Sequence, residues 1–338
     1  MKWTINKRLI LLGFILFLSF ILNLSLGSVH IPLTSVIEIL IGKSTSNDAW
    51  NNIIWHFRMT KALTCILAGS ALSLAGLLMQ TLFRNALAGP DVLGLSSGAS
   101  LAVSLIFLGS SAGFSIGVLS AWSVVSAASL GCAFVFVLVM WVARKLRDDT
   151  ALLIVGLMIG ATASSIVSVL QYLSNANDQQ AFMIWTFGSL GGLNWTEILI
   201  LAVILVAGVT TSISQLKSLN GWLLGDLYAG SLGINVKLAR SVMIFCACIL
   251  TGAVTAFCGP IAFVGLAVPH LCRMIFKTHD HKLLIPAVVV GGSTLLLLCD
   301  IIAQLPGNDY VLPINAITAL IGAPVVISII LQRKRIAI

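Results

Sequence analysis

Ten long apolar runs follow one another along the chain, separated by short polar gaps. Most have the length, about 17–25 residues, that an α-helix needs to cross a hydrocarbon layer roughly 30 Å thick. Helices are the expected spanning form, because a helix satisfies its own backbone hydrogen bonds and such continuous runs are not typical of barrel strands. The third, seventh and eighth runs are short. The predicted spans are Leu9–Gly27, Ala62–Phe83, Val92–Leu108, Ala121–Val142, Thr150–Leu173, Trp195–Ile213, Ser241–Phe257, Ile261–Phe276, Leu283–Ala303 and Leu312–Leu331.

The basic residues lie mainly in alternate gaps, and this predicts the orientation. If the amino terminus is inside, only three of the 19 Lys and Arg residues fall outside, namely Lys43, Arg58 and Lys61. Short cytoplasmic loops are enriched in Lys and Arg, so an even number of spans with both termini in the cytoplasm is favoured. The net charge of +8 then faces an anionic inner leaflet and requires no nucleic acid as a partner.

Composition excludes a water-soluble globule. The chain is 59% hydrophobic and 9% charged, with a mean hydropathy of +1.07, which leaves too little polar surface to cover such a fold. No soluble domain fits between the spans, so residues 1–338 are expected to form a single transmembrane domain. The seven cysteines lie in apolar segments without a CxxC pair, which is typical of small buried hydrophobes.

Enzyme signatures are missing from the sequence, so we expect no catalytic residues, no cofactor and no metal site. There is no HExxH and no paired intramembrane carboxylate. His279-Asp280-His281 has metal-ligand chemistry, but an isolated HxH in a basic turn is far more often solvated. Asp300 lies well inside a span, where an acid is either a functional group or a carboxylate that pairs within the bundle.

Small residues recur at helical spacing and predict close packing, because helices in lipid associate through backbone approach without a hydrophobic drive between them. They are Gly69, Ser73 and Gly76 in the second span, Gly94, Gly98 and Ala102 in the third, and Gly156 and Gly160 in the fifth.

Two segments are interrupted by Gly, Pro and charge. One is RNALAGPDVLGLSSGAS from Arg84 to Ser100, and the other is CGPIAFVGLAVPHLCR from Cys258 to Arg273. We expect Gly259-Pro260 to end one helix and Pro269 to bend the next. Broken backbone at membrane depth persists only when it is buried in protein or lines an aqueous cavity.

These segments resemble the FecCD-type permeases, the membrane subunits of ABC importers for iron-siderophores, haem and vitamin B12. The second segment is similar to the family's GPIxFVGLxxPHxxR and the first to RNPLAxPxxLGxSSGA, while residues 320–324 match LIGAP. The resemblance marks a set of gate, hinge and motif residues: Arg84, Asn85, Pro90, Gly94, Gly98, Gly259, Pro260, Pro269, His270 and Arg273.

The resemblance implies an all-α, type II importer permease with ten spans, a second permease copy around the pathway, two cytoplasmic ATPases and an external binding protein. The segment at about 215–238 contains LNGWLLGDLYAGSLGI, which resembles the family's ATPase-coupling segment. We therefore expect Gly225, Asp226, Ala229 and Gly233 to contact the ATPase, with Ala229 and Gly233 offering a surface that another protein approaches closely.

Arg58 and Lys61 stand where the family has basic residues that pair with acidic side chains of the binding protein. Three residues apart, they share one helix face, and interfacial snorkelling is the alternative interpretation. The sequence departs from the family at Gln304, where an arginine often follows the aspartate that matches Asp300.

The sequence thus predicts a permease of the bacterial inner membrane, a homodimer that conducts a ferric chelate inward without an ATPase motif of its own. A vitamin B12 or haem permease of the same family is the first alternative. The second is an ion-coupled secondary transporter that uses Asp300 for protons.

Overall fold

The computed structural model describes residues 2–27, 29, 31–42, 48–109, 121–146, 149–304 and 311–336. Its helices are α1 (Lys2–Ser25), α2 (Leu33–Leu40), α3 (Asp48–Asn52), the π-helix η1 (Ile53–Arg58), α4 (Met59–Leu82), the 3₁₀ helix η2 (Pro90–Leu93), α5 (Leu95–Phe107), α6 (Ala121–Lys145), α7 (Asp149–Leu173), α8 (Ala176–Thr186), α9 (Trp195–Ser214), α10 (Leu216–Trp222), α11 (Asp226–Ser231), α12 (Val236–Cys258), α13 (Val264–Phe276), α14 (His281–Ala303) and α15 (Ile314–Ile336).

Every predicted span corresponds to an apolar helix of this all-helical fold. Among the described residues, seven helices are long and apolar enough to cross a membrane, and the shorter apolar helices are Leu95–Phe107, Val264–Phe276 and Ile314–Ser328. The expectation that the seventh span is short was wrong, because α12 is 23 residues long. Its first turns carry Lys237 and Arg240, which hid its beginning in the apolar pattern.

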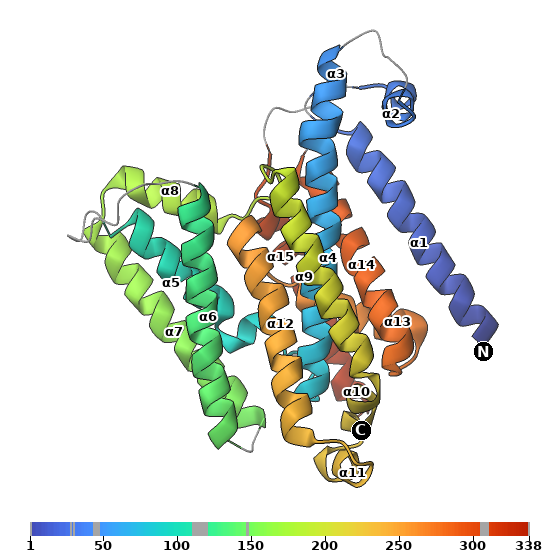
Figure 1. The fold of residues 1–338 in the computed structure, drawn as a ribbon, viewed down its shortest axis with the longest axis vertical. Helices are drawn as coiled ribbons and strands as arrows, with labels where there is room; N and C mark the ends of the chain where they lie inside the picture. The colour runs from blue at the N-terminus through green and yellow to red at the C-terminus, as the bar shows by residue number, and fades with distance from the viewer. Residues whose placement is uncertain are drawn as a thin grey trace.

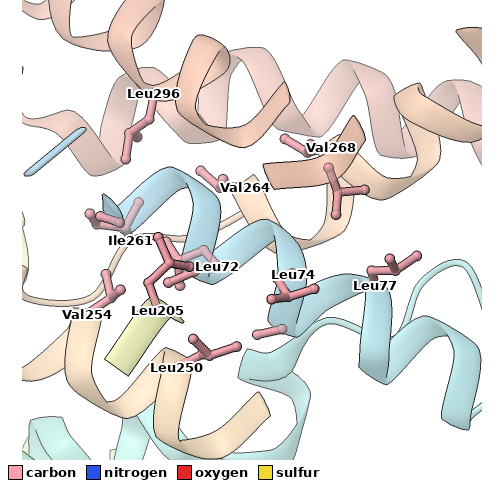
Figure 2. Packing of buried hydrophobic residues seen from close by; sticks show 14 of the residues in the cluster. Leu72, Leu74, Leu77, Leu205, Leu250, Val254, Ile261, Val264, Val268 and Leu296 are labelled. Carbon is pink, nitrogen blue, oxygen red and sulfur yellow. The ribbon is translucent and has the colours of Figure 1, made fainter. Parts of the chain in front are cut away.

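The central element is α4, which other spans surround. Figure 1 shows α9, α12 and α14 around it, α5–α8 grouped on one side and α1 along the opposite edge. Every residue from 68 to 83 is buried. Figure 2 shows how Leu72, Leu74 and Leu77 of α4 meet apolar side chains of the surrounding helices. This helix therefore runs through the core of the bundle.

Glycines bring α4 into backbone contact with its neighbours, as the spacing of small residues predicted. A methyl group added to Gly69 would overlap the backbone of Gly292 in α14, and one added to Gly76 would overlap the carbonyl of Gly265 in α13. Hydroxyls reinforce the crossing, since Ser73 Oγ donates to the Val288 carbonyl at 2.7 Å. Close approach of this kind replaces the hydrophobic drive that is lacking between helices in lipid.

Glycines likewise join the helices on the side of α5. A methyl on Gly98 of α5 would overlap the side chain of Val135 and come within 2.6 Å of the Gly131 carbonyl of α6, while one on Gly94 would lie 3.0 Å from the Gly156 carbonyl of α7. The predicted close packing of the third and fifth spans is thus confirmed, and the first interrupted segment anchors α6 and α7.

Gly76→Val should destabilise the protein by about 3 kcal/mol or more, because the added side chain meets backbone that cannot rotate away. Gly13→Val is the matched control, since Gly13 has open space where a Cβ would be added. Thermal unfolding in detergent measures both. Equal midpoints for the two variants would contradict the packing described for α4.

Candidate functional site

The short helices α10 and α11 lie at one end of the bundle, which we call the α10–α11 end (Figure 1). Trp222, the last residue of α10, is fully buried, and its indole N–H donates to the Leu82 carbonyl at 3.1 Å. Leu82 is the last residue of α4. The predicted coupling segment is therefore fastened to the end of the central helix.

Asn220 and His281 form a second connection, which joins α10 to α14 by hydrogen bonds. His281 Nδ1 lies 2.7 Å from Asn220 Oδ1, and the backbone N–H of His281 donates to the same oxygen at 3.0 Å. An amide oxygen only accepts, so Nδ1 carries the proton. Nε2 of the ring lies 2.7 Å from Thr81 Oγ1 in the last turn of α4. One histidine thus joins the ends of three helices.

The expectation that the HxH sequence is solvated was wrong for His281, which is 1% exposed. Asp280, the N-cap of α14, is exposed and accepts from Asn220 Nδ2 at 2.9 Å. Hydrogen bonds from the backbone N–H of Lys282 and from the Asn220 amide lower the pKa of Asp280 below its ordinary value. Among the described residues, no three potential metal ligands gather in one place.

Arg84 and Asn85 form the turn that ends α4. Arg84 has a positive φ of 47°, and Asn85 Oδ1 accepts from the Leu87 backbone N–H at 3.0 Å. The guanidinium of Arg84 reaches the residue before α11, because a Cβ added to Gly225 would lie 3.3 Å from Arg84 Nη1. The first family motif therefore meets the predicted coupling segment directly.

Ala229 is fully buried, so the expectation that it offers a surface to another protein was wrong. Its methyl group faces α10, about 3.9 Å from where a Cβ on Gly221 would lie. Gly233, by contrast, is exposed and has open space around it. The side chain of Asp226 lies outside the described residues. The roles of Gly225, Asp226, Ala229 and Gly233 in coupling stay predictions.

Apolar side chains that the sequence reading did not single out cover the exposed face of this segment. Leu224, Tyr228 and Leu232 are exposed at the α10–α11 end. Tyr228 lies in α11 and Leu232 is its C-cap residue, while Leu224 precedes the helix, before Gly225. The apolar side chains in this polar, cytoplasm-predicted segment were the available signal in the sequence.

The second interrupted segment begins directly after α12, and the prediction that Gly259-Pro260 ends a helix is confirmed. The last residue of α12 is Cys258, and Gly259 has a φ of 73°. A Cβ at Gly259 would lie 2.7 Å from the Trp185 carbonyl of α8, so only glycine fits both the backbone angle and the space. The Ala262 N–H donates to Asn315 Oδ1 of α15 at 3.1 Å.

The helix that follows connects the two family motifs. A Cβ on Gly265 of α13 would lie 2.9 Å from Pro90 Cδ of η2, so the two motifs are in contact. Arg273 donates to Gln80 Oε1 at 2.5 Å, and Gln80 Nε2 donates to the Leu266 carbonyl at 3.0 Å. Arg273 therefore points inward at α4.

The remaining motif residues of α13 have less defined roles. Pro269 lies inside the helix, as expected, and the bend predicted there stays a prediction. His270 is half-buried on the same helix.

Asp300 is the centre of a polar cluster at the end opposite α10 and α11. Its Oδ1 lies 2.8 Å from Lys61 Nζ of α4. Its Oδ2 accepts from Asn23 Nδ2 of α1 at 2.8 Å and from Gln304 Nε2 at 2.6 Å. Of the two interpretations of this acid, the geometry shows the paired carboxylate, and Gln304 takes a place where the family often has arginine.

Arg58 holds the end of α1. Its Nη1 donates to the Leu24 and Ser25 carbonyls at 2.7 and 2.8 Å, and Nη2 donates to the Val29 carbonyl. The side chain is only 9% exposed. Arg58 and Lys61 both line a cleft of about 280 Å³, together with Asn23, Gly27, Val29, Ile53, Phe57 and Gln304. Docking of a binding protein there stays a prediction.

Comparison with known proteins supplies the context for these sites. The sequence pattern of the FecCD transport family matches residues 15–332. The chain is 34% identical over 336 residues to the hemin transport system permease protein HmuU of Yersinia pestis, covering 99% of this chain and 98% of that one. It is 33% identical over 282 residues to the vitamin B12 import system permease protein BtuC of Klebsiella pneumoniae, covering 83% of each.

A solved structure has the same fold. It is an inward-facing ABC transporter that is described as being of the metal-chelate type. The TM-score is 0.84 at 27% sequence identity, and the match covers 97% of this chain and 99% of the other.

Lys61→Met should destabilise the protein more than Asp300→Asn does. The first change leaves a carboxylate that is 2% exposed without its cation, at a cost on the order of 3 kcal/mol. The second leaves a lysine that is 21% exposed and can reach water. The double variant should recover most of the loss, as measured by thermal unfolding. Equal single losses that simply add would contradict the ion pair as a coupled unit.

Proposed function

Because the chain belongs to the FecCD transport family, we propose that it is the membrane-spanning subunit of an ABC importer that carries a ferric chelate inward. A separate ATPase supplies the energy, and an external protein delivers the cargo. The family match and the fold of a metal-chelate type transporter support the assignment. The observation that carries it is the fastening of α10 to both α4 and α14, which is the connection that a separate motor protein requires.

The proposed mechanism follows from the contacts at the α10–α11 end. An ATPase that closes on ATP pushes on the exposed side chains of Leu224, Tyr228 and Leu232. The push passes to α10 because Ala229 packs against Gly221. It reaches α14 through Asn220 and His281, and α4 through Thr81 and Leu82. In this proposal, Gly225, Asp226 and Gly233 complete the ATPase contact.

The moving parts are proposed to be the two interrupted segments. Gly259-Pro260 and Pro90 start or end helices where the backbone is buried between other helices. Packed segments of this kind switch between alternative arrangements more readily than they deform continuously. The Gly265–Pro90 contact would let both segments shift together between inward-open and outward-open states.

The orientation and assembly are also proposals. The α10–α11 end faces the cytoplasm, with both termini, in a bacterial inner membrane, since this places most basic residues inside. A second copy of the chain completes the pathway. At the outer end, an acidic side chain of the binding protein enters the cleft lined by Arg58 and Lys61.

Affinity for the binding protein should then fall as ionic strength rises, and a salt-independent affinity would contradict this docking.

A vitamin B12 or haem cargo is the alternative within the family, which the names of two relatives favour. The proton-coupled alternative is weakened by the contacts of Asp300, whose two oxygens are held by Lys61, Asn23 and Gln304.

Uptake into proteoliposomes tests the proposed function. The chain is reconstituted with an ATPase and a binding protein that co-purify with it, and labelled ferric siderophore, haem and cobalamin are offered in turn. We expect uptake of the ferric chelate that requires ATP inside the vesicle and persists in Asp300→Asn. Uptake driven by a proton gradient without the ATPase, and abolished by Asp300→Asn, would establish the secondary transporter instead.

Asn220→Ala should uncouple ATP hydrolysis from uptake. Loss of a half-buried partner of His281 weakens the joint by about 1–3 kcal/mol, so cargo imported per ATP should fall several-fold while the ATPase still co-purifies. Asn235→Ala is the matched control, because Asn235 caps α12 at the same end by accepting from Leu238 N–H. Equal coupling ratios in the two variants would contradict the role of the joint.

A further inference from the structure

A groove of about 490 Å³ lies between α6 and α12, away from the sites described above. The two helices lie side by side in Figure 1. Its walls are mainly apolar, and the rings of Phe136 and Phe245 meet across it with centroids 5.6 Å apart. The lining residues are Phe136, Val137, Met140, Trp141, Arg144, Ser241, Val242 and Phe245.

Positive charge gathers at one end of this groove. Arg144 lines it, and Lys145 Nζ lies 3.9 Å from the centroid of the Trp141 ring, which also lines it. From the start of α12, Arg240 donates to the Leu146 carbonyl at 3.1 Å, and Lys237 is exposed nearby in the same helix. None of the lining residues is acidic. The groove therefore combines apolar walls with a positively charged end.

We propose that this groove binds an anionic phospholipid, with the phosphate at Arg144 and Lys145 and one acyl chain along Phe136, Val137 and Phe245. Basic pockets between spanning helices recognise anionic headgroups. Trp141, which is 57% exposed, lies between the apolar wall and the charges, where tryptophan concentrates in membrane proteins. The site lies at the α10–α11 end, so the proposed orientation assigns it to the inner leaflet.

Charge complementarity favours a lipid over a protein at this site. A two-fold contact with a second copy would bring the same patch against itself, so that the positively charged ends of the two grooves would repel each other. A water-soluble partner would have to enter the hydrocarbon depth to reach Phe136 and Phe245. An anionic phospholipid matches the charged end with its phosphate and the apolar walls with an acyl chain. It requires neither contact between like charges nor entry of a water-soluble protein into the membrane.

Quenching of Trp141 by brominated lipids tests the proposal in the purified chain. The chain is placed in nanodiscs that contain either brominated phosphatidylglycerol or brominated phosphatidylcholine. The Trp141 signal is the difference between the wild type and Trp141→Phe. We expect phosphatidylglycerol to associate at Trp141 about tenfold more strongly than phosphatidylcholine, and the preference to vanish in Arg144→Gln/Lys145→Gln. No ATPase or transport is involved, so the outcome is independent of the proposed function.

Lys277→Gln/Lys282→Gln is the matched control, because it removes two exposed cations at the same end but away from the groove. This variant should keep the preference for phosphatidylglycerol. Equal quenching by the two lipids in the wild type would overturn the proposal and leave an ordinary lipid-facing surface. Absence of quenching by either lipid would also overturn it, because protein would then cover the groove.

Discussion

Backbone contact along α4 is the constraint on which the rest of this structure depends. Gly69 meets Gly292 and Gly76 meets Gly265 so closely that no side chain fits between the helices. Contacts of this kind fix the register of α4 against α13 and α14, because a shift along the helix would place larger residues at the crossing. The polar groups at both ends of α4 are held in place by this register. At one end Lys61 meets Asp300, and at the other Thr81 meets His281.

These two ends lie about 36 Å apart, given 24 residues at 1.5 Å each. A rigid central helix of this length connects the cleft proposed for docking with the segment proposed for coupling. The connection is physical, since each end is tied to a different neighbour by named hydrogen bonds. The interrupted segments at Pro90 and Gly259 lie beside this helix, and a Cβ on Gly265 would meet both Pro90 and the Leu72 carbonyl of α4.

The spans, the close packing and the family motifs were predictable because each has a local signal. Apolar length predicts a span, glycine spacing predicts a crossing, and Gly259-Pro260 predicts a helix end. The joint between Asn220 and His281 was not predictable, because it pairs polar side chains 61 positions apart. Arg58 and Ala229 were predicted to lie on the surface, because only the fold shows that α1 covers Arg58 and that α10 covers Ala229. The apolar pattern also misplaced the start of α12, where Lys237 and Arg240 interrupt it.

The central claim is that α10 and α14 move as one unit, and spin-label distances test it most directly. Labels on Lys217→Cys and Lys282→Cys report this pair, because both positions are exposed and the seven native cysteines are buried. Dilution with unlabelled chain isolates the distance within one copy. Between the nucleotide-free and ATP-bound complexes, this distance should stay constant while the Lys217→Cys distance between two copies changes. A shift of several ångströms within one copy, in a complex that still imports cargo, would contradict the account.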